Sequence, residues 1–234
     1  MKPILISEIF GPTIQGEGAL VGRPTLFVRT GGCDFRCDWC DSLYAVLPEF
    51  RDTWRKMSAE EIVSELDALC ENRPMLVTLS GGNPALQPLD ELLRSGHQRG
   101  YTFAMETQGS TARDWFAELD YLVLSPKPPS SKMTTDWNRV RACRDAARSV
   151  PTTIKIVVFD EADYQFARAA KEELPDLPFY LQVGNANPMA DSHDNSASTQ
   201  GLEWLLARAL RDGWKDVTIL PQLHVLLWGN KRGV

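Results

Sequence analysis

The chain has 234 residues and a formal net charge of −6, and 43% of its residues are hydrophobic and 24% charged. This length and composition fit one folded domain with a sizeable core and argue against a disordered chain. The acidic balance argues against a nucleic-acid surface, no apolar run approaches the ~20 residues of a membrane helix, and the first residues lack a signal-peptide pattern. Five cysteines, three of them clustered, argue against a secreted disulfide framework. We therefore expect a cytoplasmic protein without nucleic-acid or membrane partners.

Short apolar runs alternate with helical patterns along the chain. Ser58-Ala59-Glu60-Glu61 has the form of a capping box, and Ile62, Leu66 and Leu69 continue it as an amphipathic helix. Strands separated by single helices indicate parallel βαβ units of one hand, which form an open sheet or a full or partial barrel. In chain order, we expect strands at 26–30, 75–79, 102–105, 121–124, 154–158, 179–183 and 217–220, and helices at 58–69, 88–99, 137–148, 163–174 and 202–211.

Polar or Gly-rich segments follow most of the expected strands. Ligands of parallel α/β folds bind at the carboxyl ends of the strands, so these segments are expected to gather at one rim. Gly and Pro also punctuate ordinary loops, and the joint placement therefore carries more weight than any one segment. The segments are Cys33–Cys40, Ser80–Pro84, Glu106–Gly109, Ser125–Lys127 and Gln182–Asn185.

The densest of these segments contains Cys33, Cys37 and Cys40. Iron–sulfur clusters normally take four cysteine ligands, and structural zinc sites are closed by four protein ligands. A loop with three thiols is therefore either completed from elsewhere or open at one position. A zinc site completed by the distant His193 or His224, a simple iron–sulfur electron carrier, and a redox pair of Cys37 and Cys40 all remain alternatives at this point.

The remaining two cysteines have no comparable context. Cys70 falls on the apolar face of one expected helix and Cys143 within another. Both are best interpreted as small buried hydrophobic residues.

The Cys-x3-Cys-x-aromatic-Cys pattern resembles that of the radical S-adenosylmethionine (SAM) enzymes. This resemblance implies a 4Fe–4S cluster on Cys33, Cys37 and Cys40, with the fourth iron open to the amino and carboxylate groups of SAM. Gly81-Gly82-Asn83-Pro84 is similar to that superfamily's Gly-Gly-Glu-Pro motif, which receives the methionine amino group. Asn83 departs from the usual glutamate, and its amide oxygen can accept a hydrogen bond only without the charge-assisted part.

Further segments resemble the 7-carboxy-7-deazaguanine synthase family, with matches from near residue 8 to residue 234. The Thr13–Gly18 block and the last segment are more specific than the cysteine motif. A glycyl-radical-enzyme activase is the alternative within the superfamily, but it would leave both unexplained. The matching segments are Gly11–Gly18, Cys37–Ser42, Glu106–Gly109, Ser125–Pro129 and Pro221–Val234.

The family resemblance implies a fold, a reaction and partners. It implies one radical SAM domain over residues 1–234, a partial parallel β/α barrel, with a tail from about residue 221 closing over the active site. The implied enzyme is a carbon–nitrogen lyase of queuosine biosynthesis. It converts 6-carboxy-5,6,7,8-tetrahydropterin to 7-carboxy-7-deazaguanine with release of ammonia. A 5′-deoxyadenosyl radical from SAM takes and returns the C6 hydrogen, Mg²⁺ assists, a flavodoxin or ferredoxin supplies electrons, and the protein is a homodimer.

Three site residues have explicit alternatives. Arg29 lies inside an apolar strand and needs a partner, either the substrate carboxylate or an ion pair with a residue such as Asp34. Glu17 would bind the N–H edge of the pterin, and its alternative is a solvated turn. Ser42 would bind Mg²⁺ together with the substrate carboxylate, and its alternative is a helix cap.

The resemblance assigns the other residues to SAM or to substrate. The implied SAM contacts are Trp39, Cys40, Asp41, Gly82, Asn83, Ser125, Pro126, Lys127, Gln182, Val183, Gly184 and Asn185. The implied substrate contacts are Ile14, Gln15, Gly16, Glu17, Arg29, Ser80, Glu106, His224 and the terminal carboxylate of Val234.

Overall fold

The computed structural model describes residues 2–185, 188 and 196–234. The strands are β1 (Ile4–Ile14), β2 (Pro24–Thr30), β3 (Arg55–Met57), β4 (Leu76–Gly81), β5 (Thr102–Thr107), β6 (Tyr121–Leu124), β7 (Thr152–Val158), β8 (Phe179–Val183) and β9 (Val217–Leu220). The α-helices are α1 (Leu43–Val46), α2 (Ala59–Leu69), α3 (Asp90–Gln98), α4 (Trp137–Ala147), α5 (Glu161–Glu173), α6 (Ser196–Arg211) and α7 (Leu223–Trp228). Short 3₁₀ helices are η1 (Gly18–Leu20), η2 (Pro48–Thr53), η3 (Pro84–Leu86), η4 (Asp114–Glu118) and η5 (Pro129–Ser131).

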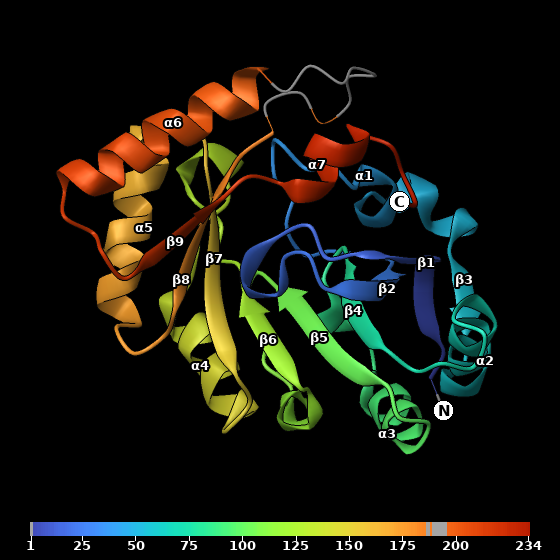
Figure 1. Cartoon of the computed structure of the whole chain (residues 1–234). Coiled ribbons are helices and arrows are strands. Elements are labelled where there is room, and N and C mark those ends of the chain that lie inside the picture. Colours follow the sequence, from blue (N-terminus) through green and yellow to red (C-terminus); the bar gives the residue numbers. More distant parts are fainter. Residues whose placement is uncertain (1, 186–187, 189–195) are drawn as a thin grey trace.

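The described strands form one nine-stranded sheet in the order β3-β1-β2-β4-β5-β6-β7-β8-β9. From β2 to β9 every neighbouring pair is parallel, whereas β1 runs antiparallel to both β2 and β3. β3 and β9 form the two edges, so the curved sheet does not close on itself (Figure 1). The expectation of one domain built as an incomplete parallel β/α barrel is confirmed.

The expected strands and helices are found as β2, β4 to β9 and α2 to α6, with small shifts at most ends. The exception is α6, which begins at Ser196 and not at residue 202. β1 and β3 were not expected. β1 contains Gly11-Pro12, which normally interrupts a strand, but the β1–β2 pairing shifts register between Phe10 and Thr13 and takes up the break as a bulge. β3 is only Arg55–Met57, too short to show a period.

α2 begins at the expected capping box. The Glu61 N–H donates to Ser58 Oγ at 3.2 Å, and the Ser58 N–H donates to Glu61 Oε2 at 2.7 Å. Ile62 and Leu66 face the sheet and are fully buried. Two otherwise unsatisfied N–H groups are thus bonded, and the apolar face is set against the core.

The core lies between the sheet and the helices that cover its outer face in Figure 1. Cys70 and Cys143 are both buried within it, as expected from the sequence. None of the described helices is long and apolar enough to cross a membrane. The largest fully buried side chains include Phe103, Phe116, Tyr164 and Phe179.

β2 and β4 end side by side, and this junction forms the base of the cysteine loop. Gly82 N–H donates to Thr30 O at 3.0 Å, and Asn83 N–H donates to Gly32 O at 2.8 Å. A Cβ atom on Gly82 would lie 2.1 Å from Gly32 O, so only glycine lets the two segments approach this closely.

Candidate active site

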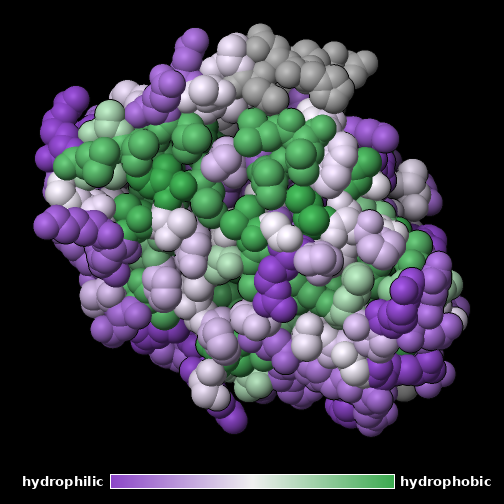
Figure 2. Space-filling model, in the orientation of Figure 1, coloured by the Kyte–Doolittle hydropathy of each residue, from purple (hydrophilic) through white to green (hydrophobic). Residues whose placement is uncertain are grey.

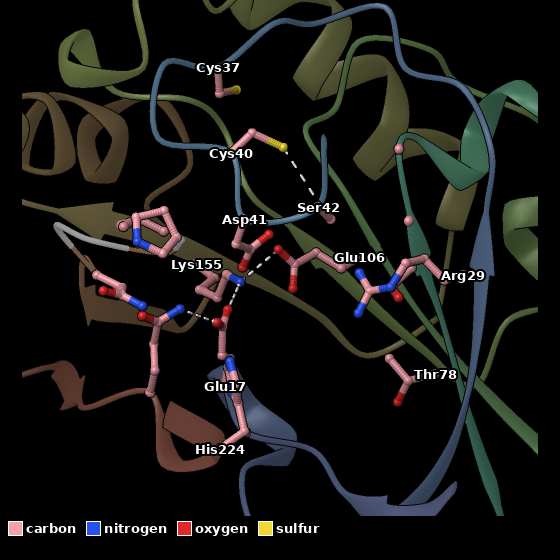
Figure 3. A pocket seen from close by; sticks show the side chains of 18 of the residues that line it. Glu17, Arg29, Cys37, Cys40, Asp41, Ser42, Thr78, Glu106, Lys155 and His224 are labelled. Atoms are coloured by element: carbon pink, nitrogen blue, oxygen red, sulfur yellow. Dashed lines mark hydrogen bonds and ion pairs between the residues drawn. The ribbon is translucent and has the colours of Figure 1, made fainter. Parts of the chain in front are cut away.

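A cavity of about 230 Å³ opens where the parallel strands end (Figure 3). Its wall combines residues from the loop after β1, the cysteine loop, the ends of β4, β5 and β7, and the segment around α7. Most of the site residues expected from the sequence line it. They are Ile14, Gln15, Gly16, Glu17, Arg29, Cys33, Cys37, Trp39, Cys40, Asp41, Ser42, Ser80, Gly82, Glu106, Lys127, Asn185, His224 and Val234.

Six expected SAM contacts do not line this cavity: Asn83, Ser125, Pro126, Gln182, Val183 and Gly184. Ser125 is buried and its Oγ accepts a hydrogen bond from Lys127 Nζ at 3.1 Å. Gln182 is fully buried and joins two segments, since its Oε1 accepts from Gly18 N–H at 3.3 Å and its Nε2 donates to Leu220 O at 3.2 Å. In this structure the Ser125 and Gln182 side chains position the wall and do not form its surface.

The three clustered thiols are free, partly exposed, and all face the cavity. Burial raises the pKa of each thiol, that of Cys37 to about 11, while the Lys127 ammonium acts in the opposite direction on all three. Polar groups reach two of the sulfurs: Gln108 Nε2 donates to Cys33 Sγ at 3.6 Å, and Ser42 Oγ lies 3.8 Å from Cys40 Sγ.

This donor set fits an iron–sulfur cluster better than a single metal ion. Among the described residues, no three His, Cys, Asp or Glu side chains converge as the ligands of one ion. Cysteines of a polynuclear cluster each ligate a different iron and need no common point. The alternative zinc ligand His193 lies outside the described residues, and His224 lines another part of the cavity wall.

Trp39 forms an aromatic wall near the thiols. Its Nε1 donates to Ser130 Oγ at 2.9 Å, and its ring centroid lies 5.3 Å from that of Phe159. Lys127 Nζ lies 5.7 Å from the Trp39 ring centroid. Two rings and a cation on this wall suit a flat, aromatic ligand group such as adenine.

A buried ion cluster lies in another part of the cavity. Lys155, on β7 and only 4% exposed, forms ion pairs with Glu17 and Glu106, the latter at 2.6 Å, as Figure 3 shows. Gln222 Nε2 donates to the other Glu17 oxygen at 2.6 Å. Burial alone would raise the pKa of Glu17, but the charges of Lys155 and His224 and these hydrogen bonds lower it to about 2. The alternative of a solvated turn at Glu17 is wrong.

Lys155 and Gln222 were not expected from the sequence. A signal for Lys155 exists, because it interrupts the apolar strand Ile154–Val158 just as Arg29 interrupts β2. A lysine buried in a strand needs a partner, and this logic could have identified it. Gln222 lies in the matching segment Pro221–Val234, but nothing in that segment singles out its side chain.

Arg29 is ion-paired, but not with Asp34. Its Nε donates to Glu8 Oε1 at 2.8 Å, and Glu8 also accepts from Tyr44 Oη and from Arg232 Nε at 2.7 Å. Glu8 precedes the predicted motifs and lies on the unexpected strand β1, which explains the wrong partner. Arg29 still lines the cavity beside its ion pair.

Asn83 is a fully buried hub beneath the cysteine loop. Its Nδ2 donates to Asp34 Oδ1 and to Ser110 Oγ, both at 3.0 Å. Its Oδ1 accepts from Thr107 Oγ1 at 2.8 Å and from Ala85 N–H at 3.2 Å. These four bonds use the ordinary capacity of the amide. In this structure the Asn83 amide therefore has no ordinary hydrogen-bonding capacity left for a further ligand contact.

Two serines carry hydroxyls suited to a ligand. Ser80 Oγ is buried on the cavity wall without a hydrogen-bond partner in the described part of the chain, a costly state that a bound polar group would relieve. Ser42 occupies the N-cap position of α1 but makes no capping hydrogen bond. Ser42 therefore occupies the N-cap position, but its hydroxyl does not cap the helix.

The segment around α7 meets the loop after β1. Leu223 N–H donates to Gly16 O at 2.9 Å, and a Cβ atom on Gly16 would lie 2.1 Å from His224 Nδ1. The glycine at position 16 thus lets the imidazole pack directly on this loop. Val234 lines the same cavity.

Comparison with known proteins identifies the family. The Radical SAM superfamily matches residues 27–172. A 7-carboxy-7-deazaguanine synthase of Bacillus cereus is 43% identical over 238 residues and covers 100% of both chains. That of Bacillus subtilis is 43% identical over 242 residues, covering 100% of this chain and 99% of the relative.

A solved structure supports the fold. The crystal structure of QueE from Escherichia coli superposes with a TM-score of 0.69 at 20% identity and covers 94% of both chains. The superfamily's cluster chemistry agrees with three free thiols on one open loop, and the full-length identity to the Bacillus enzymes agrees with the match of both terminal segments. The chain belongs to the radical SAM superfamily and, within it, to the 7-carboxy-7-deazaguanine synthase family.

Proposed function

We propose that this chain converts 6-carboxy-5,6,7,8-tetrahydropterin to 7-carboxy-7-deazaguanine with release of ammonia, as a carbon–nitrogen lyase of queuosine biosynthesis. The observation that carries the proposal is the composition of one cavity. It joins three free thiols to a half-buried arginine and to two half-buried carboxylates held by a buried lysine, in a chain that is 43% identical over its full length to a 7-carboxy-7-deazaguanine synthase. The thiols suit an iron–sulfur cluster, the arginine suits the substrate carboxylate, and the two carboxylates suit a ring rich in N–H donors.

The substrate end of the cavity is built from charged and hydroxyl groups. The Arg29 guanidinium, fixed through Nε by Glu8, can bind the substrate carboxylate with its remaining N–H groups. Glu17 and Glu106 offer acceptors to the pterin N–H groups, and the unpartnered Ser80 hydroxyl adds a donor or acceptor. Ile14, Gln15, Gly16 and His224 complete this wall in the proposal.

The cofactor end is built from the thiols and the aromatic wall. Cys33, Cys37 and Cys40 would hold a 4Fe–4S cluster that, with SAM, supplies a hydrogen-abstracting carbon radical when bound. Trp39, Asp41 and Lys127 lie where they can orient SAM and exclude water from it. The remaining proposed SAM contacts are Gly82, Asn83, Ser125, Pro126, Gln182, Val183, Gly184 and Asn185.

We propose a Mg²⁺ site at Ser42. The support is a serine hydroxyl that makes no capping bond and lies on the cavity wall beside Asp41. Mg²⁺ keeps several waters and accepts few protein ligands, so one hydroxyl and a substrate carboxylate are enough.

Three further proposals concern the setting of the protein. It would receive electrons from a flavodoxin or ferredoxin, the usual donors for such clusters. It would work in the cytoplasm, which is supported by five cysteines that carry no disulfide. It would form a homodimer, supported by the exposed apolar side chains of α6 beside the edge strand β9.

The decisive experiment is an anaerobic incubation of the reconstituted protein with SAM, Mg²⁺, dithionite and the carboxy-tetrahydropterin, followed by mass spectrometry. We expect 7-carboxy-7-deazaguanine and ammonia from the wild type, and neither from a Cys37→Ser variant. Absence of the product from the wild type would overturn the proposal. EPR with and without SAM separates it from an electron carrier, whose spectrum SAM would leave unchanged.

A separate test concerns the end of the cavity formed by Val234. We propose that its main-chain carboxylate contacts the substrate, as the family resemblance implies. Adding two residues after Val234, or deleting Gly233-Val234, should then raise the substrate KM at least tenfold. An unchanged KM in both variants would refute this contact.

A further inference from the structure

Among the described residues of the cavity wall, Lys155 is the centre of a strongly charged ion cluster, and none of the roles assigned above involves it. Lys155 extends from β7 into the cavity and is almost completely buried. Its Nζ contacts Glu17 on the loop after β1 and Glu106 on β5, two segments that are not neighbours in the sheet (Figure 3). One ammonium therefore fixes two carboxylates relative to each other across the cavity.

The lone pairs that these contacts leave free on the carboxylate oxygens define a recognition surface. Lys155 takes one oxygen of each carboxylate, and Gln222 takes the second oxygen of Glu17. Glu106 Oε2 has no protein partner in the described ranges, and the Glu106 side chain is 28% exposed on the cavity wall. The cluster thus presents fixed acceptors and a net charge of −1, a surface for a neutral ring that carries several N–H donors.

We propose that Lys155 is a positioning and specificity-determining residue: its ammonium holds the Glu17 and Glu106 carboxylates as a paired acceptor for the N–H edge of a 2-amino-4-oxo heterocycle. This inference rests on the proposed function, since the ring in question is that of the pterin substrate. Without the ammonium, two buried carboxylates would face each other, and one would take up a proton or turn away. A protonated carboxyl would present a donor where the ring needs an acceptor.

The same geometry argues against a proton-transfer role for Lys155. The two carboxylates raise the pKa of Lys155 above its ordinary value, although burial acts in the opposite direction. The ammonium therefore stays protonated at neutral pH and neither gives up a proton to leaving ammonia nor forms a Schiff base, which requires a free amine.

The surroundings of the cluster contain few other titratable groups. From the loop after β1 and from β5 the facing groups are Glu17 and Glu106, and from α7 His224 lies near Glu17. From β8, Tyr180 is paired with Lys155 in register. A pH dependence that appears when Lys155 is replaced is therefore expected to report on the carboxylate pair.

The test compares Lys155→Met and Lys155→Arg in the reconstituted enzyme with saturating SAM. We expect Lys155→Met to raise the substrate KM at least tenfold while kcat stays within about threefold. The ratio of its KM to that of the wild type should fall as the pH rises from 6 to 9, because the carboxyl protonated in the variant ionises. Lys155→Arg keeps a cation, so its KM should rise less and its ratio should be independent of pH.

Controls separate positioning from folding. Lys215→Met removes an exposed lysine and should change neither KM nor its pH dependence. Thermal melts and iron content show whether Lys155→Met folds and is loaded. If that variant does not fold, Lys155→Met/Glu106→Gln takes its place, because it also removes the charge that faces Glu17. Its KM should be raised, and the ratio of its KM to that of the wild type should be independent of pH because the carboxylate pair is gone.

The outcomes distinguish this inference from the proposed function. If the wild type makes no product, the proposed function itself fails. If the wild type makes product, an unchanged KM in Lys155→Met would overturn the role of Lys155. Equal losses of kcat and kcat/KM, with a ratio of variant KM to wild-type KM that does not change with pH, would also overturn it.

Discussion

Single polar residues buried under the cavity decide how firmly its wall is held. Arg29 and Lys155 each lie on an apolar strand, and each is compensated by carboxylates from a different segment. Asn83 is uncharged, but its amide likewise joins segments, because it forms hydrogen bonds with Asp34, with Ala85 and with the segment that carries Thr107 and Ser110. Removing any one of these residues leaves its buried partners unsatisfied, which costs more than the bond itself contributes.

Replacing Asn83 with alanine should therefore destabilise the protein. The buried hydroxyls of Ser110 and Thr107 and the exposed carboxylate of Asp34 would each lose a partner, so we expect the free energy of unfolding to fall by about 2–3 kcal/mol. Urea unfolding of the apo protein under reducing conditions measures this.

Two variants make the test specific. Asn138→Ala, on the exposed surface of α4, should change stability by no more than about 0.5 kcal/mol. Asn83→Glu restores the superfamily's usual residue and keeps an acceptor for Thr107 and Ala85, but it loses the Nδ2 donor and brings a second carboxylate next to Asp34, so it should also destabilise. If Asn83→Ala were as stable as the wild type, the four hydrogen bonds of Asn83 would not contribute to stability as proposed.

The depressed pKa of Glu17 predicts an acid-dependent loss of stability. Its carboxyl has an ordinary pKa of 4.5 and about 2 in the folded protein, so the folded state favours the ionised form. The corresponding stabilisation is present above pH 4.5 and is lost as the pH falls toward 2. Between these values the wild type should lose more stability than Glu17→Gln, measured by chemical unfolding at each pH. Parallel curves would argue against an ionised, buried Glu17.

At the scale of elements, the close approach of β2 and β4 sets the position of the cysteine loop. The two strands pair in parallel up to Thr30 and Gly81, and the loop begins directly after this junction. β1 adds an antiparallel strand on the other side of β2 and carries Glu8 to Arg29. The cofactor and substrate ends of the cavity thus share one strand, β2, as their common support.

The capping box of α2 gives a test at this scale. Ser58→Ala removes the acceptor for the Glu61 N–H and should lower the free energy of unfolding by about 1 kcal/mol. Ser64→Ala, exposed within the same helix, should raise it slightly because alanine has the higher helix propensity. Thermal melts of both variants should show a lower melting temperature for Ser58→Ala and a slightly higher one for Ser64→Ala. Equal melting temperatures would mean that the capping box does not stabilise the helix.

Local sequence patterns predicted most elements and only part of the site. β2 and β4 to β9 are apolar runs with clear boundaries, and periodicity is enough to find them. β1 was missed because its bulge at Gly11-Pro12 depends on pairing with β2, a contact distant in the sequence. The motif residues were found, whereas the Glu8–Arg29 pair and the Lys155 cluster were not, because partner choice depends on which strand ends meet in space.

At the scale of the whole molecule, α6 carries an exposed apolar surface among the described residues. Trp204, Leu206 and Leu210 of α6 are 37%, 48% and 72% exposed, and Figure 2 shows apolar side chains gathered over this part of the molecule. α6 packs against β9, which is an edge of the sheet formed by the described strands. An edge strand beside exposed apolar side chains is a common setting for association between chains.

If the proposed homodimer uses this surface, Leu206→Glu/Leu210→Glu should dissociate it. We expect the wild type to sediment at twice the chain mass of 26.2 kDa and the double variant at the single mass. Leu227→Glu, on α7 and 52% exposed, serves as a matched control that should stay dimeric. A dimeric double variant would place the interface elsewhere.

The bond between Gln222 and Glu17 also has a consequence for the order of events during synthesis. These two residues are 205 positions apart, and Leu223 holds Gly16 across a similar distance. The ribosome completes the cysteine loop and most of the sheet well before it delivers Gln222. A nascent chain could therefore assemble its cofactor end while its substrate end is still open to water, and the two halves of the cavity mature at different times.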